Sequence, residues 1–351
     1  MSEKERLMQI HFFNKESLDR VSGGHLYNCY LIDQLRKGKV EVIYYAVDHL
    51  ISVETFLSKA HQGDVIVIDS LLVVDNLEFV LAYRRQFPTM GMIHLPQIFD
   101  PKNQNAEVLP TVFEVERRIF ESIPMIVTSP FCKEKVVDAF GLNPNGVYVL
   151  EPGVADFKEK TNFERIPFQL LSIATFDVRK GQAKILNALA NLKAYDWEID
   201  FYGDMSYDSD YTQLVLDLVK TNQLADRIDF KGTIDHSSIN EVMTKADLFV
   251  QMSSFESYSM VIAECLSSRL PFVSTRVGAY RSFDKYDGGV FLSDFNEDTL
   301  ELTLENLFEN EIAYRQLWQN KTRKYDRDWL KVADELLDIV TIQRVFNERP
   351  N

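Results

Sequence analysis

QLLSIATFDVRKGQAKILNALANL, residues 169–192, contains a short apolar run, a polar loop and an amphipathic segment in that order. The run Gln169–Ala174 is mostly apolar without strict alternation, which is typical of a strand buried on both faces of a parallel sheet. The segment Gln182–Leu192 repeats its apolar residues at helical spacing. The stretch therefore predicts one strand–loop–helix unit of an α/β fold.

The same unit recurs along the whole chain. Predicted strands are Leu7–Phe13, Val40–Ala46, Asp64–Ile68, Gly91–His94, Met125–Thr128, Val147–Leu150, Gln169–Ala174, Glu198–Tyr202, Arg227–Phe230, Leu248–Gln251, Pro271–Ser274 and Val290–Leu292. Predicted helices are His25–Leu35, Val53–Lys59, Asn76–Gln86, Val112–Ser122, Lys133–Phe140, Gln182–Leu192, Thr212–Thr221, Ser237–Thr244, Met260–Ser267, Thr299–Phe308 and Asp328–Phe346. This alternation predicts doubly wound parallel sheets, and a dozen strands are too many for one sheet.

Two domains follow from this count and from the length of 351 residues. The segment Pro152–Pro167 is polar and contains Gly153, two terminal prolines and several charges, so it is the best candidate linker. We expect an N-terminal Rossmann-like domain over residues 1–160 and a C-terminal one over residues 161–325. In such sheets, ligands bind beyond the carboxyl ends of the strands.

Composition excludes several classes of protein. The formal charge of −15 arises from 38 basic and 53 acidic residues, and such a surface disfavours generic binding of nucleic acid. The three cysteines lie far apart without a CxxC pair, which disfavours a disulfide framework or a zinc site. The six histidines form no HxxxH or HExxH pattern, which disfavours a dedicated metal site. We also expect no cofactor.

The chain has no apolar run of about 18 residues and no signal-peptide pattern at its start. We therefore expect a cytoplasmic protein, and the sequence carries no signal for an oligomeric state. Two weakly basic predicted helices, Phe79–Pro88 and Phe113–Ile123, are candidates for a peripheral contact with the inner face of a membrane. Ordinary packing of these helices against the sheet is the alternative, and we favour it.

Two glycine-containing sites stand at predicted helix starts. Gly23-Gly24 opens the helix His25–Leu35, where small residues let backbone N–H groups approach an anion. Lys180-Gly181, with Arg179 beside it, follows a strand and precedes a helix, so its cation is placed to meet a phosphate. A tight turn and a solvated surface pair are the respective alternatives.

Two glutamates and one histidine are further candidates. Glu256 and Glu264 are eight residues apart across the start of a predicted helix, a spacing that lets both carboxylates accept hydrogen bonds from one polyol. Solvation of acids at a helix start is the alternative, but Glu264 lies between apolar neighbours and needs a partner if buried. His94 ends a strand, where it either contacts a ligand hydroxyl or serves only the fold.

Together these motifs resemble glycosyltransferase family 4, the retaining nucleotide-sugar enzymes of the GT-B fold. The family's E-x7-E motif is matched by Glu256 and Glu264, and its lysine–glycine turn by Lys180-Gly181. Further matches are Tyr202-Gly203-Asp204, Asp226–Gly232, Ala246-Asp247, Pro271–Thr275 and Val277-Gly278, with looser ones at Gly23-Gly24, His94, Val127–Ser129 and Glu151–Val154.

The resemblance implies two Rossmann-like domains facing across a cleft, with a terminal helix in residues 326–351 crossing back to the N-terminal domain. It implies transfer of a sugar from a nucleotide-diphosphate sugar, with UDP or GDP as carrier, to a hydroxyl of a glycan, lipid or small molecule. Such a reaction belongs to glycan, glycolipid or glycoconjugate biosynthesis and requires no metal.

The resemblance also assigns roles to individual residues. It gives catalytic roles to His94, Glu256 and Lys180, and it gives the ribose hydroxyls to Glu264. The implied donor-binding residues are Gly23, Gly24, Arg179, Lys180, Gly203, Lys231, Gly232, Ser257, Tyr258, Ser259, Met260, Val261 and Glu264. Backbone near Lys231 would contact the base, and Gly24 would approach the donor from the other domain.

Two departures from the family pattern keep alternatives open. Thr175 stands where the family commonly has an arginine, and Ser257 and Ser259 stand where it favours glycines. A non-catalytic nucleotide-sugar-binding subunit of a larger synthase is therefore the second interpretation. A nucleotide-sugar epimerase or a phosphorylase is the third.

Overall fold

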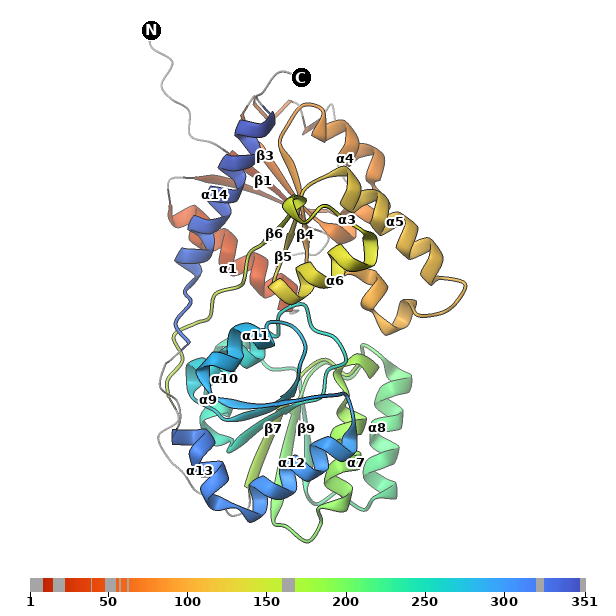
Figure 1. Ribbon diagram of the computed structural model, residues 1–351, viewed down its shortest axis with the longest axis vertical. Helices are drawn as coiled ribbons and strands as arrows, with labels where there is room; N and C mark the ends of the chain where they lie inside the picture. The colour runs from red at the N-terminus through yellow and green to blue at the C-terminus, as the bar shows by residue number, and fades with distance from the viewer. Residues whose placement is uncertain are drawn as a thin grey trace. The chain divides into compact units, whose positions relative to one another are not determined.

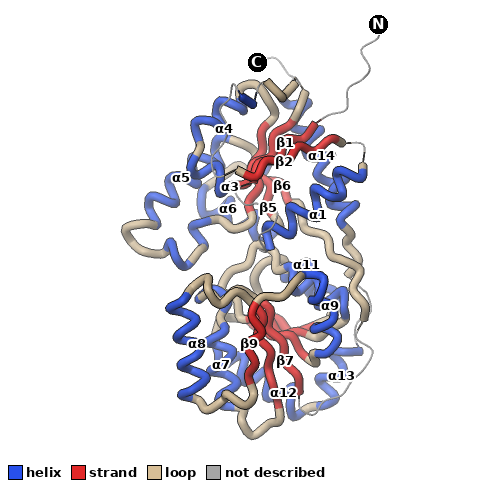
Figure 2. Tube along the Cα trace, turned by 180° about the vertical axis from the view of Figure 1, so that it is seen from behind, coloured by secondary structure: helices blue, strands red, loops and turns tan. Residues whose placement is uncertain are grey.

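The computed structural model describes residues 9–14, 23–38, 40–47, 55–56, 58–61, 63–159, 168–319 and 325–347. The chain divides into two compact units, which we call the first unit (1–153 with 327–351) and the second unit (154–326). Each unit has one six-stranded parallel sheet with helices packed around it (Figures 1 and 2).

The sheet of the first unit has the strand order β2-β1-β3-β4-β5-β6, so the strand order reverses between β1 and β3. Its strands are β1 (Gln9–Asn14), β2 (Glu41–Ala46), β3 (Val65–Asp69), β4 (Thr89–Ile93), β5 (Met125–Val127) and β6 (Val147–Val149). Its helices are α1 (Gly23–Lys37), α3 (Ser70–Asp75), α4 (Leu77–Arg84), α5 (Leu109–Ser122), α6 (Pro130–Phe140) and α14 (Trp329–Asn347).

The sheet of the second unit has the order β12-β11-β10-β7-β8-β9, which is the strand order of the Rossmann fold. Its strands are β7 (Phe168–Ile173), β8 (Trp197–Tyr202), β9 (Ile228–Gly232), β10 (Leu248–Gln251), β11 (Phe272–Thr275) and β12 (Gly289–Leu292). Its helices are α7 (Gln182–Asn191), α8 (Ser209–Thr221), α9 (His236–Lys245), α10 (Met260–Ser268), α11 (Tyr280–Phe283), α12 (Glu297–Glu309) and α13 (Glu311–Gln319).

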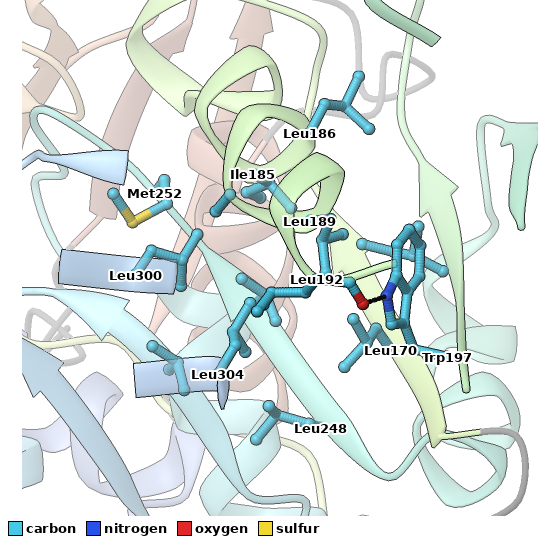
Figure 3. Close-up of a cluster of buried hydrophobic side chains, with 14 of the residues drawn as sticks. Leu170, Ile185, Leu186, Leu189, Leu192, Trp197, Leu248, Met252, Leu300 and Leu304 are labelled. Atoms are coloured by element: carbon cyan, nitrogen blue, oxygen red, sulfur yellow. Dashed lines mark hydrogen bonds between the residues drawn. The ribbon is translucent and has the colours of Figure 1, made fainter. Parts of the chain in front are cut away.

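The apolar face of α7 shows why this sequence folds as predicted. Ile185, Leu186 and Leu189 are buried there against the strands, together with Leu170 of β7 and Trp197 of β8 (Figure 3). The indole nitrogen of Trp197 donates a hydrogen bond of 2.9 Å to the carbonyl of Leu192, so its polar atom is satisfied inside the core. This packing fixes the loop between β7 and α7.

The prediction of two parallel α/β sheets of six strands is confirmed, and each predicted strand overlaps an observed one. Among the described residues, three α-helices were not predicted: α3, α11 and α13. In α3 the side chain of Asp69 accepts a hydrogen bond of 2.8 Å from the amide of Leu71, which starts a helix too short for a periodic pattern. Of the predicted helix Val53–Lys59, residues 55–56 are helical and residues 58–59 form a turn, while residues 53, 54 and 57 lie outside the described residues.

The division between the units falls after Gly153, whereas the sequence placed it after residue 160. The difference has a packing reason, because Val154 and Phe157 are buried in a hydrophobic cluster of the second unit. Asn240 of α9 also exchanges two hydrogen bonds of 3.0 Å with the backbone of Lys158. Residues 154–159 therefore pack against α9 and α10 as part of the second unit.

Helix α14 belongs to the first unit and packs beside α1 (Figure 1). The ring of Trp329 lies 5.4 Å from that of Tyr27 and 5.3 Å from that of Tyr30. Before the helix, the guanidinium of Arg327 donates hydrogen bonds of 3.0 and 2.9 Å to the carbonyl of Glu151. Helix α14 is thus part of the first unit, although it follows the second unit in the sequence.

Candidate functional site

The loops that follow β7 and β10 meet at the reversal point of the second sheet. These two strands are neighbours, and Leu248 and Phe249 pair with Leu170 and Leu171. The next strands along the chain lie on opposite sides of this pair. The carboxyl ends at such a reversal point form the usual ligand site of a doubly wound sheet. Lys180 follows β7 and Glu256 follows β10, so the fold brings together two residues that the sequence analysis had selected separately.

Lys180 and Glu256 form a partly buried ion pair, with 2.5 Å between Nζ and Oε1. Oε1 of Glu256 also accepts hydrogen bonds from Gln251 Nε2 at 3.0 Å and from Ser253 Oγ at 2.7 Å. Burial alone would raise the pKa of Glu256, but the cations of Lys180 and Arg179 hold the pKa below its ordinary value. Glu256 is therefore an ionised carboxylate at neutral pH, with three donors on one oxygen.

Arg179 braces the loop that carries Glu256. Its guanidinium donates to the carbonyl of Phe255 at 2.9 Å, and its own carbonyl accepts from the amide of Ser254 at 2.8 Å. The side chain is only 12% exposed and lies 3.7 Å from Glu256 Oε2. Arg179 is therefore held against the loop that carries Glu256 by hydrogen bonds in both directions.

Two glycines of the second unit are required by close approach. Gly181 has φ of +70°, and a Cβ atom there would lie 2.0 Å from the carbonyl oxygen of Met252. A Cβ atom on Gly203 would lie 1.9 Å from the carbonyl oxygen of Ala174. These contacts join the ends of neighbouring strands, so both glycines shape the sheet edge at which Lys180 lies.

The first turn of α10 is open at its start. Ser259, which precedes Met260 and Val261, has φ of +78°, and no side chain caps the helix. Uncapped N–H groups and the helix dipole favour an anion at such a position. The side chain of Tyr258 is 4% exposed and bonds to Tyr325, so only the backbone of Tyr258 is suited to a ligand. Ser257 is also largely buried, at 8%.

Glu264 has a different partner from Glu256. It is 4% exposed inside α10, and its Oε1 lies 2.6 Å from Nε2 of His236 at the start of α9. The two glutamates of the motif therefore belong to separate polar clusters. His236 was not predicted as a site residue, although a buried Glu264 needs a polar partner and so indicates that such a residue exists.

Lys231 and Gly232 lie at the end of β9. Lys231 is ion-paired with Asp229 and lies 3.8 Å from Asp200. Gly232 has φ of +69°, and its carbonyl accepts a hydrogen bond of 2.8 Å from the amide of Gly203. The ends of β8 and β9 are thus joined by a backbone hydrogen bond, at the place where the family resemblance implies contact with the base.

In the first unit, the fold brings His94 and Gly24 together. A Cβ atom on Gly24 would lie 2.7 Å from Cγ of His94, whereas one on Gly23 would meet nothing within 4 Å. Nε2 of His94 lies 2.9 Å from Oδ1 of Asn28. Burial, with His25 nearby, lowers the pKa of His94 to about 4. His94 is therefore a neutral imidazole with a fixed partner on α1.

No group of three or more His, Cys, Asp or Glu side chains suited to a metal ion occurs among the described residues. The three cysteines are free thiols. Within the described parts of the chain, no helix is both long and apolar enough to cross a bilayer. On α5, Arg117 is ion-paired with both Glu114 and Glu121, so this arginine adds no net positive charge to that candidate membrane helix.

Comparisons with known proteins identify the domain that carries this site. Residues 154–325 match the family model described as glycosyl transferases group 1. A mannosylfructose-phosphate synthase of Agrobacterium fabrum is 24% identical over 243 residues, which is 63% of this chain and 54% of that protein. The phosphatidylinositol N-acetylglucosaminyltransferase GPI3 subunit of Saccharomyces cerevisiae is 21% identical, over 62% of this chain and 50% of its own. The chain thus spans about half the length of these relatives.

Solved structures match over nearly the whole chain. Sucrose-phosphate synthase from Thermosynechococcus elongatus superposes with a TM-score of 0.79 at 18% identity, covering 97% of this chain and 100% of its own. HepE of Anabaena, solved with UDP and glucose, gives 0.74 at 15% identity, covering 95% and 99%. The architecture is therefore the GT-B fold. Its second unit belongs to the glycosyl transferases group 1 family, as the resemblance had implied.

Proposed function

We propose that this chain is a retaining glycosyltransferase that moves a sugar from a nucleoside-diphosphate sugar, with UDP or GDP as carrier, to a hydroxyl group. The observation that carries the proposal is the Lys180–Glu256 pair at the reversal point of a group 1 domain, next to the open start of α10. A cation and uncapped amides at one sheet edge suit a diphosphate. The UDP held by HepE supports the same ligand class.

The residues divide the work of binding by their chemistry. Lys180 and the amides of Met260 and Val261 balance the charge of the diphosphate, which grows as it leaves. Glu264 accepts hydrogen bonds from the ribose hydroxyls, and the backbone at Lys231 and Gly232 contacts the base.

His94 contacts the donor sugar near its reacting carbon, and Gly24 lies beside His94. In the step itself, the bond from the anomeric carbon to the phosphate oxygen breaks and a bond to the acceptor oxygen forms on the same face. The acceptor proton passes to the leaving phosphate, so no protein nucleophile is required.

A nucleotide-sugar-binding subunit without activity of its own is the second candidate. Thr175 in place of an arginine favours it, because one phosphate contact is then missing. Several relatives are also named as subunits of a transferase. This candidate requires donor binding without turnover by the purified chain, and transfer of sugar to any acceptor by the chain alone would exclude it.

The experiment that tests the proposal is a thermal-shift and calorimetric screen with nucleoside diphosphates and their sugar conjugates, with and without magnesium. A ligand of the folded state raises the melting temperature by mass action. We expect one nucleotide family to bind, and we expect Lys180→Ala to weaken it roughly tenfold to more than a hundredfold. Lys245→Ala, on the exposed face of α9, is the matched control because its cation pairs with Glu241 one turn away. If Lys180→Ala binds the nucleotide as tightly as Lys245→Ala does, Lys180 does not contribute to donor binding.

A further inference from the structure

Gln251 is an unusual residue in its position. It ends β10, an otherwise apolar strand in the middle of the second sheet, and it is only 4% exposed. A buried amide must be hydrogen-bonded, or it costs free energy that an apolar residue would not. The contacts of Gln251 therefore indicate what this residue does.

The amide of Gln251 has one orientation. The carboxylate of Glu256 only accepts hydrogen bonds, so the nitrogen Nε2 faces it, at 3.0 Å from Oε1. The same nitrogen lies 2.9 Å from Ser253 Oγ. The amide oxygen Oε1 then faces Ser259, whose hydroxyl donates to it at 3.1 Å. Gln251 is thus a bridge between the Glu256 carboxylate and the residue that precedes α10.

Ser259 is a serine that does not cap its helix. Serine at this position ordinarily accepts a hydrogen bond from an amide of the first turn. Here φ of +78° turns the residue away from the usual capping conformation, and Gln251 holds the hydroxyl. The first amides of α10 therefore stay without a side-chain cap.

We propose that Gln251 is a positioning residue of the donor site. It keeps the Ser259 hydroxyl out of the capping position and keeps Glu256 aligned with Lys180, so that the start of α10 stays open for a phosphate group. The inference rests on the proposed function. Gln251 acts through Ser259 and Glu256 and does not itself touch the donor.

The loop has separate anchors that keep its backbone in place without Gln251. The hydroxyl of Thr275 donates to the carbonyl of Ser253 at 2.5 Å, and the amide of Ala279 donates to the carbonyl of Tyr258 at 2.8 Å. Glu256 also retains Lys180 and Ser253 as partners. We therefore expect a variant of Gln251 with similar volume to fold.

The test compares Gln251→Met with the wild type by calorimetry, using UDP and GDP against the phosphate-free uridine and guanosine. We expect the affinity for the diphosphate to fall about tenfold, the effect of one polar contact, while the affinity for the nucleoside stays the same. The same substitution in a Ser259→Gly background should cost less, because no hydroxyl remains to be held. Gln213→Met, on the exposed face of α8, is the matched control.

The outcomes distinguish a failure of this inference from a failure of the proposed function. A wild type that binds no nucleoside diphosphate overturns both. If the wild type binds one and Gln251→Met leaves that affinity unchanged, or lowers diphosphate and nucleoside equally, then Gln251 serves only the fold and the proposed function stands. An undiminished effect in the Ser259→Gly background would remove Ser259 from the proposal.

Discussion

The imidazole Nε2 of His236 lies 2.6 Å from Oε1 of Glu264, and this contact joins the start of α9 to the interior of α10. The two side chains are 11% and 5% exposed, so the contact is shielded from water. One oxygen of the carboxylate is thereby committed to the protein. The histidine sets the direction in which the carboxylate is held.

We predict that His236→Ala weakens nucleotide binding through the ribose. The loss of one hydrogen bond to Glu264 corresponds to roughly a twofold to tenfold change in affinity. The affinity for the matching 2′-deoxynucleotide should change less, because that ligand offers fewer hydroxyls to Glu264. His236→Gln, which keeps a donor, should recover part of the loss. Equal losses for both nucleotides would show that His236 acts elsewhere.

Gly24 and Gly23 give a matched pair of substitutions. Gly24→Ala places a methyl group 2.7 Å from the His94 ring, so we expect a cost of about 1–3 kcal/mol in the free energy of unfolding. Gly23→Ala has open space around its new methyl group, so we expect no loss of stability. Urea unfolding measures both. A destabilised Gly23→Ala would mean that the helix start, and not the contact with His94, decides the result.

The fold was readable from the sequence because parallel strands buried on both faces keep their apolar runs intact, as in Leu248–Gln251. Lys180 and Glu256 were found because each lies in the loop between a predicted strand and the helix that follows it. His236 and Gln251 were missed for a different reason. Their partners lie 28 residues away, at Glu264, or on a loop whose course depends on the positive φ of Ser259. Such contacts come from tertiary packing, which has no period in the sequence.

The low pKa of His94 predicts a loss of stability in acid. Its folded pKa of about 4 lies below the value of 6.5 for the free side chain, so the unfolded chain takes up the proton first. The stability contributed by neutral His94 is therefore complete above about pH 6.5 and is lost as the pH falls toward about 4. Asn28→Asp places a carboxylate beside the ring and should raise the pKa of His94, as an NMR titration would measure. If the pKa of His94 is unchanged in Asn28→Asp, the side chain at position 28 does not interact with the imidazole ring.

Glu116 gives the opposite dependence on pH. It is 2% exposed on α5, and its carboxylate accepts hydrogen bonds from the amides of Gln97 at 2.7 Å and Ile98 at 3.0 Å, just beyond His94. Burial outweighs these two bonds and raises the pKa of Glu116 from 4.5 to about 7. Because the folded pKa lies above the unfolded one, the contribution of Glu116 to stability is complete below about pH 4.5 and is lost as the pH rises to about 7.

Glu116→Gln removes this titration, so its stability relative to the wild type should improve as the pH rises from about 4.5 to about 7 and then stay constant. Urea unfolding of both proteins at several pH values measures the difference. Glu114→Gln is the matched control on the same helix. Arg117 lowers the pKa of the exposed Glu114, so any small change there should run in the opposite direction. A constant difference for Glu116→Gln between about pH 5 and about pH 7 would mean that the carboxylate is ionised throughout, and that its two amide bonds outweigh its burial.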